Sequence, residues 1–192
     1  MKIIGISYGR ELPNQVYLMA DSAIIRSNKP FFVPNFAQSF SGIAAIVLHI
    51  DRLGKHIAPR FAHRYCHSVS PAIKVKACGL SLAQTSESTS ALSSSFDGGL
   101  LLGDDMPITD IETINNAKVT IARNDESHTA LTLNEMGIDI SNVISQLSVY
   151  FTLKMGDMIV VELQGCQATK LTPGDTLRAS LNDAAQLVIR VK

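Results

Sequence analysis

The 192-residue chain lacks the features that mark several classes of protein. Its three cysteines, Cys66, Cys78 and Cys166, form no CxxC pair and are odd in number, so neither a zinc knuckle nor a disulfide framework is indicated. Its 17 Lys and Arg are balanced by 17 Asp and Glu, which leaves no basic surplus for a nucleic-acid partner. No apolar run approaches the roughly 18 to 20 residues of a membrane span. The run after Met1 is too brief for a signal peptide, so we expect a cytoplasmic protein that does not associate with membranes.

Short segments with strand-like patterning fill most of the chain. The segments that we expect to form strands are residues 2–8, 15–19, 22–27, 43–50, 72–78, 114–123, 154–163, 172–181 and 186–192. Residues 58–69 and 140–151 instead repeat apolar residues at helical spacing, and Asp139 or Ser141 can cap the second helix. This pattern predicts a β-rich α+β fold with few short helices, in a single domain over residues 1–192.

The segment 81–95 differs from its surroundings, because it holds seven Ser and two Thr in 15 residues. Ser and Thr side chains compete with the backbone for hydrogen bonds and so weaken helices. We therefore interpret the segment as a surface loop, with a lid over a former reaction site as the alternative.

Two local patterns could carry chemistry. His63 and His67 lie four residues apart in a predicted helix with Cys66 beside them, a spacing that can serve zinc, although further ligands are not evident. Lys74 and Lys76 point to one face of a predicted strand. A desolvated lysine can be a nucleophile, and a solvated pair is the alternative, since no partner is visible nearby in the sequence.

Several motifs, taken in order and spacing, resemble the fumarylacetoacetate hydrolase family, above all its short bacterial members. The motifs are "KPFFVPNF", "GKHIAPRFAHRY", "SFDGG", "DIETINNAKVTI" and "YFTLKMGDMIVVEL…LTPGDTL". The resemblance implies a mixed β-roll with few helices and a homodimer. It also implies a Mg²⁺ or Mn²⁺ site at which diketo or oxo-acid substrates undergo C–C hydrolysis, decarboxylation or isomerisation.

The family's metal would be held by three carboxylates, because such hard cations prefer oxygen ligands. With the flanking motifs as anchors, the two Glu positions of the family fall on Ile43 and Ala45, in the apolar run "SGIAAIVLHI". The Asp position falls on Lys74. The resemblance therefore implies that the metal ligands are replaced, and we expect Ile43, Ala45 and Leu48 to fill the pocket or to line a small apolar cavity.

The positions of the family's other functional residues are replaced as well. Its two lysines fall on Met19 and Ser94, and its Thr-Ala-Arg-Asp segment begins at Lys76. Its catalytic His has no counterpart, since no His precedes His49. Its Gly-Thr-Pro-x-Gly loop falls roughly on the segment that begins at Glu162.

Two hypotheses follow from this comparison. In the first, the chain is a non-catalytic member of the family that needs no cofactor. It would act as a binding, regulatory or partner subunit, in a homodimer or in a heteromer with a related active subunit. In the alternative, it is a Mg²⁺- or Mn²⁺-dependent hydrolase, isomerase or decarboxylase of an acylpyruvate-type substrate. Under either hypothesis the pocket-equivalent residues are Ile43, Ala45, Lys74, Lys76 and Ser94.

Overall fold

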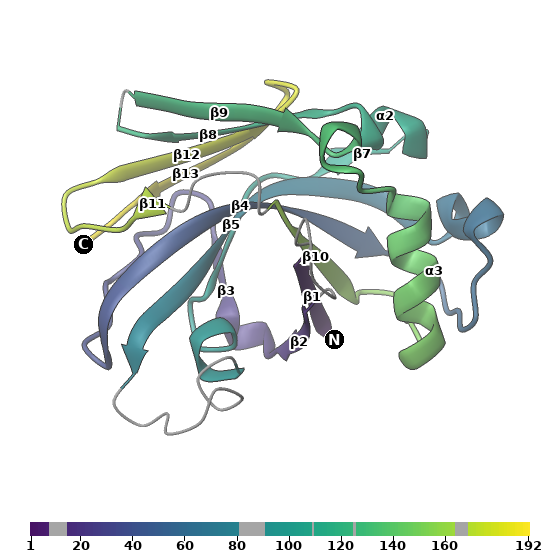
Figure 1. Cartoon of the computed structure of the whole chain (residues 1–192), viewed down its shortest axis with the longest axis horizontal. Coiled ribbons are helices and arrows are strands. Elements are labelled where there is room, and N and C mark those ends of the chain that lie inside the picture. The colour runs from purple at the N-terminus through teal and green to yellow at the C-terminus, as the bar shows by residue number, and fades with distance from the viewer. Residues whose placement is uncertain (8–14, 81–90, 109, 125, 164–168) are drawn as a thin grey trace.

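The chain folds into two packed β-sheets with a few short helices at their edges (Figure 1). The structure is a computed structural model that describes residues 1–7, 15–80, 91–108, 110–124, 126–163 and 169–192. In these residues no helix is long and apolar enough to cross a membrane. The predicted β-rich α+β fold is confirmed.

The larger sheet has nine strands and the smaller sheet has four. The larger sheet contains β1 (Ile3–Ser7), β2 (Gln15–Met19), β3 (Ile24–Arg26), β4 (Ala37–Ile50), β5 (Cys66–Leu80), β6 (Leu100–Leu102), β7 (Met106–Pro107), β10 (Met158–Glu162) and β11 (Thr169–Lys170). The smaller sheet contains β8 (Lys118–Arg123), β9 (Glu126–Thr132), β12 (Thr176–Leu181) and β13 (Ala185–Arg190). The helices include α2 (Ile111–Asn115) and α3 (Ile140–Tyr150), together with the 3-10 turns η1 (Asp21–Ala23), η2 (Pro59–Arg64) and η3 (Asn134–Met136).

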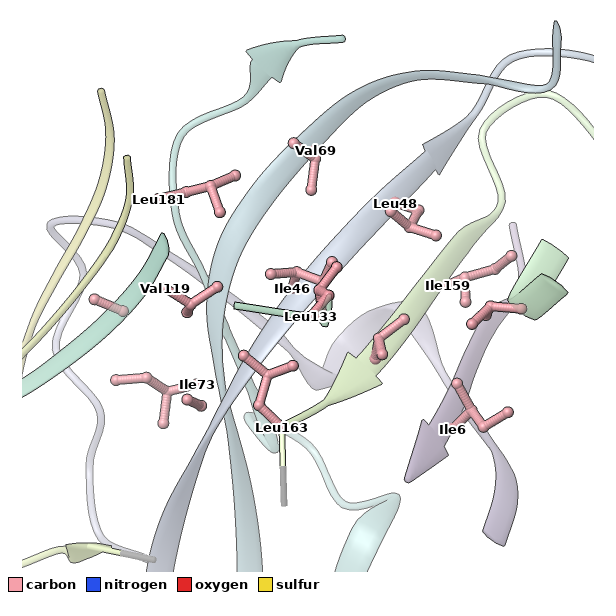
Figure 2. Packing of buried hydrophobic residues seen from close by; sticks show 14 of the residues in the cluster. Ile6, Ile46, Leu48, Val69, Ile73, Val119, Leu133, Ile159, Leu163 and Leu181 are labelled. Carbon is pink, nitrogen blue, oxygen red and sulfur yellow. The ribbon is translucent and has the colours of Figure 1, made fainter. Parts of the chain in front are cut away.

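The long antiparallel pair of β4 and β5 is the centre of the fold, and one of its faces carries the main core. Ile46 and Leu48 of β4 point to this face, together with Val69 and Ile73 of β5 (Figure 2). The smaller sheet and α3 cover it, as Figure 1 shows. Because successive strand residues alternate between faces, the neighbours of these residues must face the other way.

The opposite face of β4 and β5 carries a second, smaller core. Ala45 and Val47 of β4 pack there with strands β1, β2, β6 and β10. Since both faces of β4 are buried, its sequence is a nearly continuous apolar run rather than an alternating one. This second face positions the candidate site.

The N-terminal strand pairs in the larger sheet with a strand from far along the chain. Strand β1 pairs in parallel with β10, so that Ile3 lies opposite Met158. Asp157 fixes this junction, because its carboxylate accepts hydrogen bonds from the backbone N–H of Lys2 at 2.7 Å and from Lys2 Nζ at 2.5 Å. The sheet is therefore mixed, with strands that are distant in the sequence side by side.

Most of the expected elements are present, and the helix predicted over residues 140–151 is confirmed as α3. The Asp139 side chain caps it by accepting a hydrogen bond from the Ser141 N–H at 2.9 Å. The helix predicted over residues 58–69 is wrong: a 3-10 turn ends at Arg64 and β5 begins at Cys66. Pairing with β4 outweighs the local helical spacing there. Helix α2 overlaps the first two residues of the strand that we expected over 114–123, and that strand begins instead at Lys118, as β8.

The proposed zinc spacing of His63 and His67 depends on the helix that does not form. His63 lies on η2 and His67 on β5, so the two imidazoles do not share one helix face. Of the Ser-rich segment, residues 81–90 lie outside the described residues, and residues 91–94 are helical.

Candidate functional site

The register of three neighbouring strands brings the pocket-equivalent positions Ile43, Ala45, Lys74 and Lys76, but not Ser94, onto the second face of the larger sheet. Ile43 of β4 lies opposite Lys74 of β5. Ala45, two residues further along β4, lies opposite Glu162 of β10. Side chains that are directly opposite in a sheet share a face, and so do residues two apart in one strand. Lys74 and Glu162 therefore flank β4 on the same side.

Lys74 is completely buried. Together with Glu162, Lys76 and Tyr17 it forms the buried polar group of the candidate site. Its Nζ donates hydrogen bonds to the carbonyl oxygens of Val75 at 2.6 Å and Gly99 at 3.0 Å. The ring centres of Tyr17 and Phe96 lie 5.7 and 5.6 Å from Nζ. Burial lowers the pKa of Lys74 to about 7, with the charge of Glu162 acting in the opposite direction and that of Lys76 in the same direction.

Glu162 is the carboxylate of the group and is also fully buried. Its Oε2 lies 2.8 Å from Lys76 Nζ, an ion pair that is not aligned as a hydrogen bond. Its Oε1 accepts a short hydrogen bond from the Tyr17 hydroxyl. Burial, together with the charge of Glu162 and this hydrogen bond, raises the pKa of Tyr17. The hydroxyl therefore stays protonated and can donate.

Two aromatic residues close over the group. The Tyr17 ring lies on Gly5 of the paired strand β1, where an added Cβ would come within 2.1 Å of the ring carbon Cζ. Phe96 comes from a turn before β6. A hydrogen bond from Ser95 Oγ to the Leu18 carbonyl oxygen at 2.7 Å fixes this turn to the end of β2. The side chain of Lys76 is 22% exposed, so the group reaches the surface beside it.

The expectation that Leu48 helps to fill the pocket is wrong, because Leu48 points to the main core on the opposite face. Ala45 lies on the expected face, in the second core, against which Tyr17 packs. Phe96 packs against the main core, and its ring centre lies 5.6 Å from Lys74 Nζ. Met19 is buried in the second core on β2, and Ser94 is buried just before the turn of Phe96. Lys74 and Lys76 share a strand face, as their spacing predicts.

Sequence reasoning gave no role to Glu162, Tyr17 or Phe96. A signal for Glu162 is present in the sequence, since it is a lone carboxylate at the end of the apolar strand "MIVVE". A buried acid of this kind needs a cationic partner, and Lys76 provides it. The contact between Tyr17 and Glu162 spans 145 positions and depends on the strand order, which local patterns do not reveal.

In the part of the chain that the structure describes, no three His, Cys, Asp or Glu side chains are grouped so that they could hold a metal ion. The ionisable groups that meet at the candidate site are two lysines, one glutamate and one tyrosine. These groups can bind an anion, move a proton or provide an amine nucleophile.

The sequence profile for the fumarylacetoacetate (FAA) hydrolase C-terminal domain matches residues 7–192. The chain belongs to this family. A curated relative, the mitochondrial oxaloacetate tautomerase fahd-1 of Caenorhabditis elegans, is 22% identical over 183 residues. That match covers 93% of this chain and 84% of the relative. The family prediction made from the ordered motifs is therefore confirmed.

Solved structures of the family share the fold. A fumarylacetoacetate hydrolase family protein from Yersinia pestis CO92 has a TM-score of 0.83 at 19% identity, over 100% of this chain and 92% of that one. The fumarylpyruvate hydrolase of Pseudomonas aeruginosa, solved in complex with Mn²⁺ and pyruvate, has a TM-score of 0.87 at 13% identity. That match covers 100% of this chain and 89% of the hydrolase. Identities this low establish the common fold alone.

Proposed function

We propose that this chain is a member of the family that does not carry out a metal-dependent reaction and acts instead as a binding, regulatory or partner subunit. The observation that carries the proposal is the place of Lys74. Its amine lies opposite Ile43, at the position where the family resemblance puts a metal-binding carboxylate. The only carboxylate beside it among the described residues, that of Glu162, is already engaged by Lys76 and Tyr17.

The side chains at the three implied ligand positions do not fit a divalent cation. Ile43 and Ala45 offer hydrocarbon, and Lys74 offers nitrogen where Mg²⁺ and Mn²⁺ prefer oxygen. If Lys74 is protonated, charges of +2 and +1 about 4 Å apart repel by roughly 8 kcal/mol at an effective dielectric constant of ~20. If Lys74 is neutral, its amine is a poor ligand for these hard ions. Both protonation states disfavour the metal.

Calorimetric titration with Mn²⁺ tests the proposal. We expect no stoichiometric binding in the micromolar range, and no metal-stimulated turnover of oxaloacetate or of an acylpyruvate. The Pseudomonas aeruginosa fumarylpyruvate hydrolase, solved with Mn²⁺ and pyruvate, is the positive control in the same buffer. Micromolar stoichiometric binding of Mn²⁺ would overturn the proposal in favour of a metal-dependent hydrolase, isomerase or decarboxylase.

We also propose that the chain works as a dimer, either with itself or with a related active subunit. Exposed apolar side chains support this, since Val16 on β2 is 45% exposed and Tyr150 on α3 is 77% exposed. Together with Ile6, Leu147 and Phe151 they line a mostly apolar groove of about 430 Å³. Native mass spectrometry of the protein from its own cells tests the association. A chain that remains monomeric at micromolar concentration would contradict it.

A further inference from the structure

The hydrogen bonds of Lys74 match a neutral amine better than an ammonium ion. A neutral amine has two N–H donors and one lone pair, whereas an ammonium ion has three donors and no lone pair. Among the described residues, Nζ has two oxygen acceptors, the carbonyls of Val75 and Gly99. The third hydrogen of an ammonium ion would face the Tyr17 and Phe96 rings, which attract a cation but do not accept a hydrogen bond as an oxygen does. The neutral form satisfies both carbonyls and keeps its lone pair.

The surroundings of Nζ favour the same form. The lysine is completely buried, and the cation of Lys76 lies in the same group. Both effects disfavour a second positive charge, and they lower the pKa of Lys74 to about 7 even though Glu162 opposes the shift. Glu162 is paired to Lys76 at 2.8 Å, so its charge is already balanced.

We propose that Lys74 is a nucleophile that binds a small 2-oxo acid covalently, as a reversible imine. This inference rests on the proposed function, because it requires that no metal ion occupies the space beside Lys74. The 2-oxo acid follows from charge balance. A protonated imine adds one positive charge to the buried group, and the carboxylate of the ligand cancels it. A neutral aldehyde would leave that charge uncompensated in the interior.

The reaction balances with the groups present. The Nζ lone pair forms a bond to the carbonyl carbon, and the carbonyl oxygen accepts a proton to give a carbinolamine. The hydroxyl then takes a second proton and leaves as water, as the C=N bond forms. One of these protons comes from the amine and the other from the surrounding water, so the imine nitrogen keeps one hydrogen and carries the positive charge. We assign their relay to Tyr17, whose ring contacts Lys74 and whose hydroxyl donates to the carboxylate of Glu162.

Access to Nζ requires movement of Phe96, whose ring covers the lysine. The turn that carries Phe96 is held by two hydroxyl hydrogen bonds: one runs from Ser95 to the Leu18 carbonyl, and the other from Ser22 Oγ to Asp97 Oδ1 at 2.5 Å. A ligand would enter beside the partly exposed Lys76. Phe96→Ala should therefore speed up capture without removing the nucleophile.

Chemical trapping tests the inference on the full chain. The protein is incubated with pyruvate and cyanoborohydride, which reduces imines to stable secondary amines, and the labelled lysine is identified by peptide mass spectrometry. We expect label on Lys74 at least tenfold above that on Lys55 of the same sample, rising with pH through about 7 as the amine loses its proton. Tyr17→Phe should slow labelling at least tenfold, and Phe96→Ala should accelerate it.

The matched control is Lys74→Met, which keeps an unbranched side chain, shorter by one atom, and removes the amine. Circular dichroism establishes whether the variant folds. If the variant does not fold, peptide mapping of the unaltered protein still identifies which lysine carries the label. Label that stays at the level of Lys55, or that is the same in Phe96→Ala, overturns the inference. If Mn²⁺ binds stoichiometrically, the proposed function fails whatever the label shows. If Mn²⁺ does not bind and Lys74 is unlabelled, the imine alone is wrong.

Discussion

Replacing Lys74 by Met should change how the stability of the protein depends on pH. In the folded chain the buried amine has a pKa of about 7, below the ordinary lysine value of 10.5 that applies when the chain is unfolded. Between these values the unfolded state binds more protons than the folded state, so the free energy of unfolding rises with pH. The cost of burying Lys74 is therefore complete below pH 7 and disappears above pH 10.5.

The size of this effect follows from the two pKa values. Their separation corresponds to about 5 kcal/mol at low pH, taking roughly 1.4 kcal/mol per pH unit. At pH 7, where half of the folded molecules are neutral, the cost is about 4 kcal/mol, and at pH 9.5 it has fallen to about 1 kcal/mol. The folded state should thus gain about 3 kcal/mol from this one group between pH 7 and pH 9.5.

Urea unfolding of both proteins at several pH values from 7 to 9.5 measures this difference. Subtracting the two curves removes the other groups that titrate in this range, and stopping at pH 9.5 avoids the region above pH 10, where the raised pKa of Tyr17 begins to lower stability. We expect the stability of Lys74→Met relative to the unaltered protein to fall by about 3 kcal/mol across the series. A relative stability that stays constant within about 0.5 kcal/mol would refute a neutral, buried lysine.

Three further predictions concern other parts of the structure. The double variant Ile43→Glu and Ala45→Glu should not bind Mn²⁺ at micromolar concentration while Lys74 remains, and calorimetry that detects such binding would contradict our account of the site. Asp157→Asn should lower the free energy of urea unfolding by about 2 to 3 kcal/mol, because the carboxylate accepts charge-assisted hydrogen bonds from Lys2. Burial alone would raise the pKa of Asp157, but the hydrogen bonds from Lys2 outweigh it and lower the pKa. The contribution of Asp157 to stability should therefore be complete above about pH 4 and be lost as the pH falls through the lowered pKa of the folded state. Unfolding curves of the unaltered protein and of Asp157→Asn, measured from pH 5 to pH 2.5, check this loss. Asp139→Ala should lower the free energy of unfolding by about 1 kcal/mol, measured by thermal unfolding, since it removes the cap of α3. No change would mean that the cap does not stabilise the protein.

The sequence predicts strands well where burial dominates the pattern. The apolar run from Ile43 to Ile50 and the alternation in residues 72–78 both lie in the long central strands β4 and β5. These strands are predictable because the pattern of apolar residues reports directly which faces are buried. It fails over residues 58–69, where Pro59 and the four-residue spacing of apolar side chains favour a helix. The ladder with β4 extends to Cys66 instead, and a local pattern carries no information about a partner strand.

The candidate site was predictable only in part, for the same reason. The order of the motifs implies that Ile43, Ala45 and Lys74 stand at the positions of the family's metal ligands. The structure brings Ile43 and Lys74 directly opposite one another. The partners that decide the chemistry of Lys74 come from elsewhere in the chain. Tyr17 on β2 and Glu162 on β10 are separated by the single strand β1, and their side chains meet across it. The strand order sets this arrangement, and no spacing in the sequence reveals it.

The parallel pairing of β1 with β10 also sets the order of events during synthesis. Lys2 and Asp157 are separated by 155 positions, so β1 leaves the ribosome long before its partner exists. At roughly 5 to 20 residues per second, the delay is on the order of ten to thirty seconds. During that time the apolar strand beginning at Ile3 has only its hairpin partner β2. The larger sheet, and with it the buried group around Lys74, therefore closes as a late step, and the nascent chain depends until then on protection from non-native strand pairing.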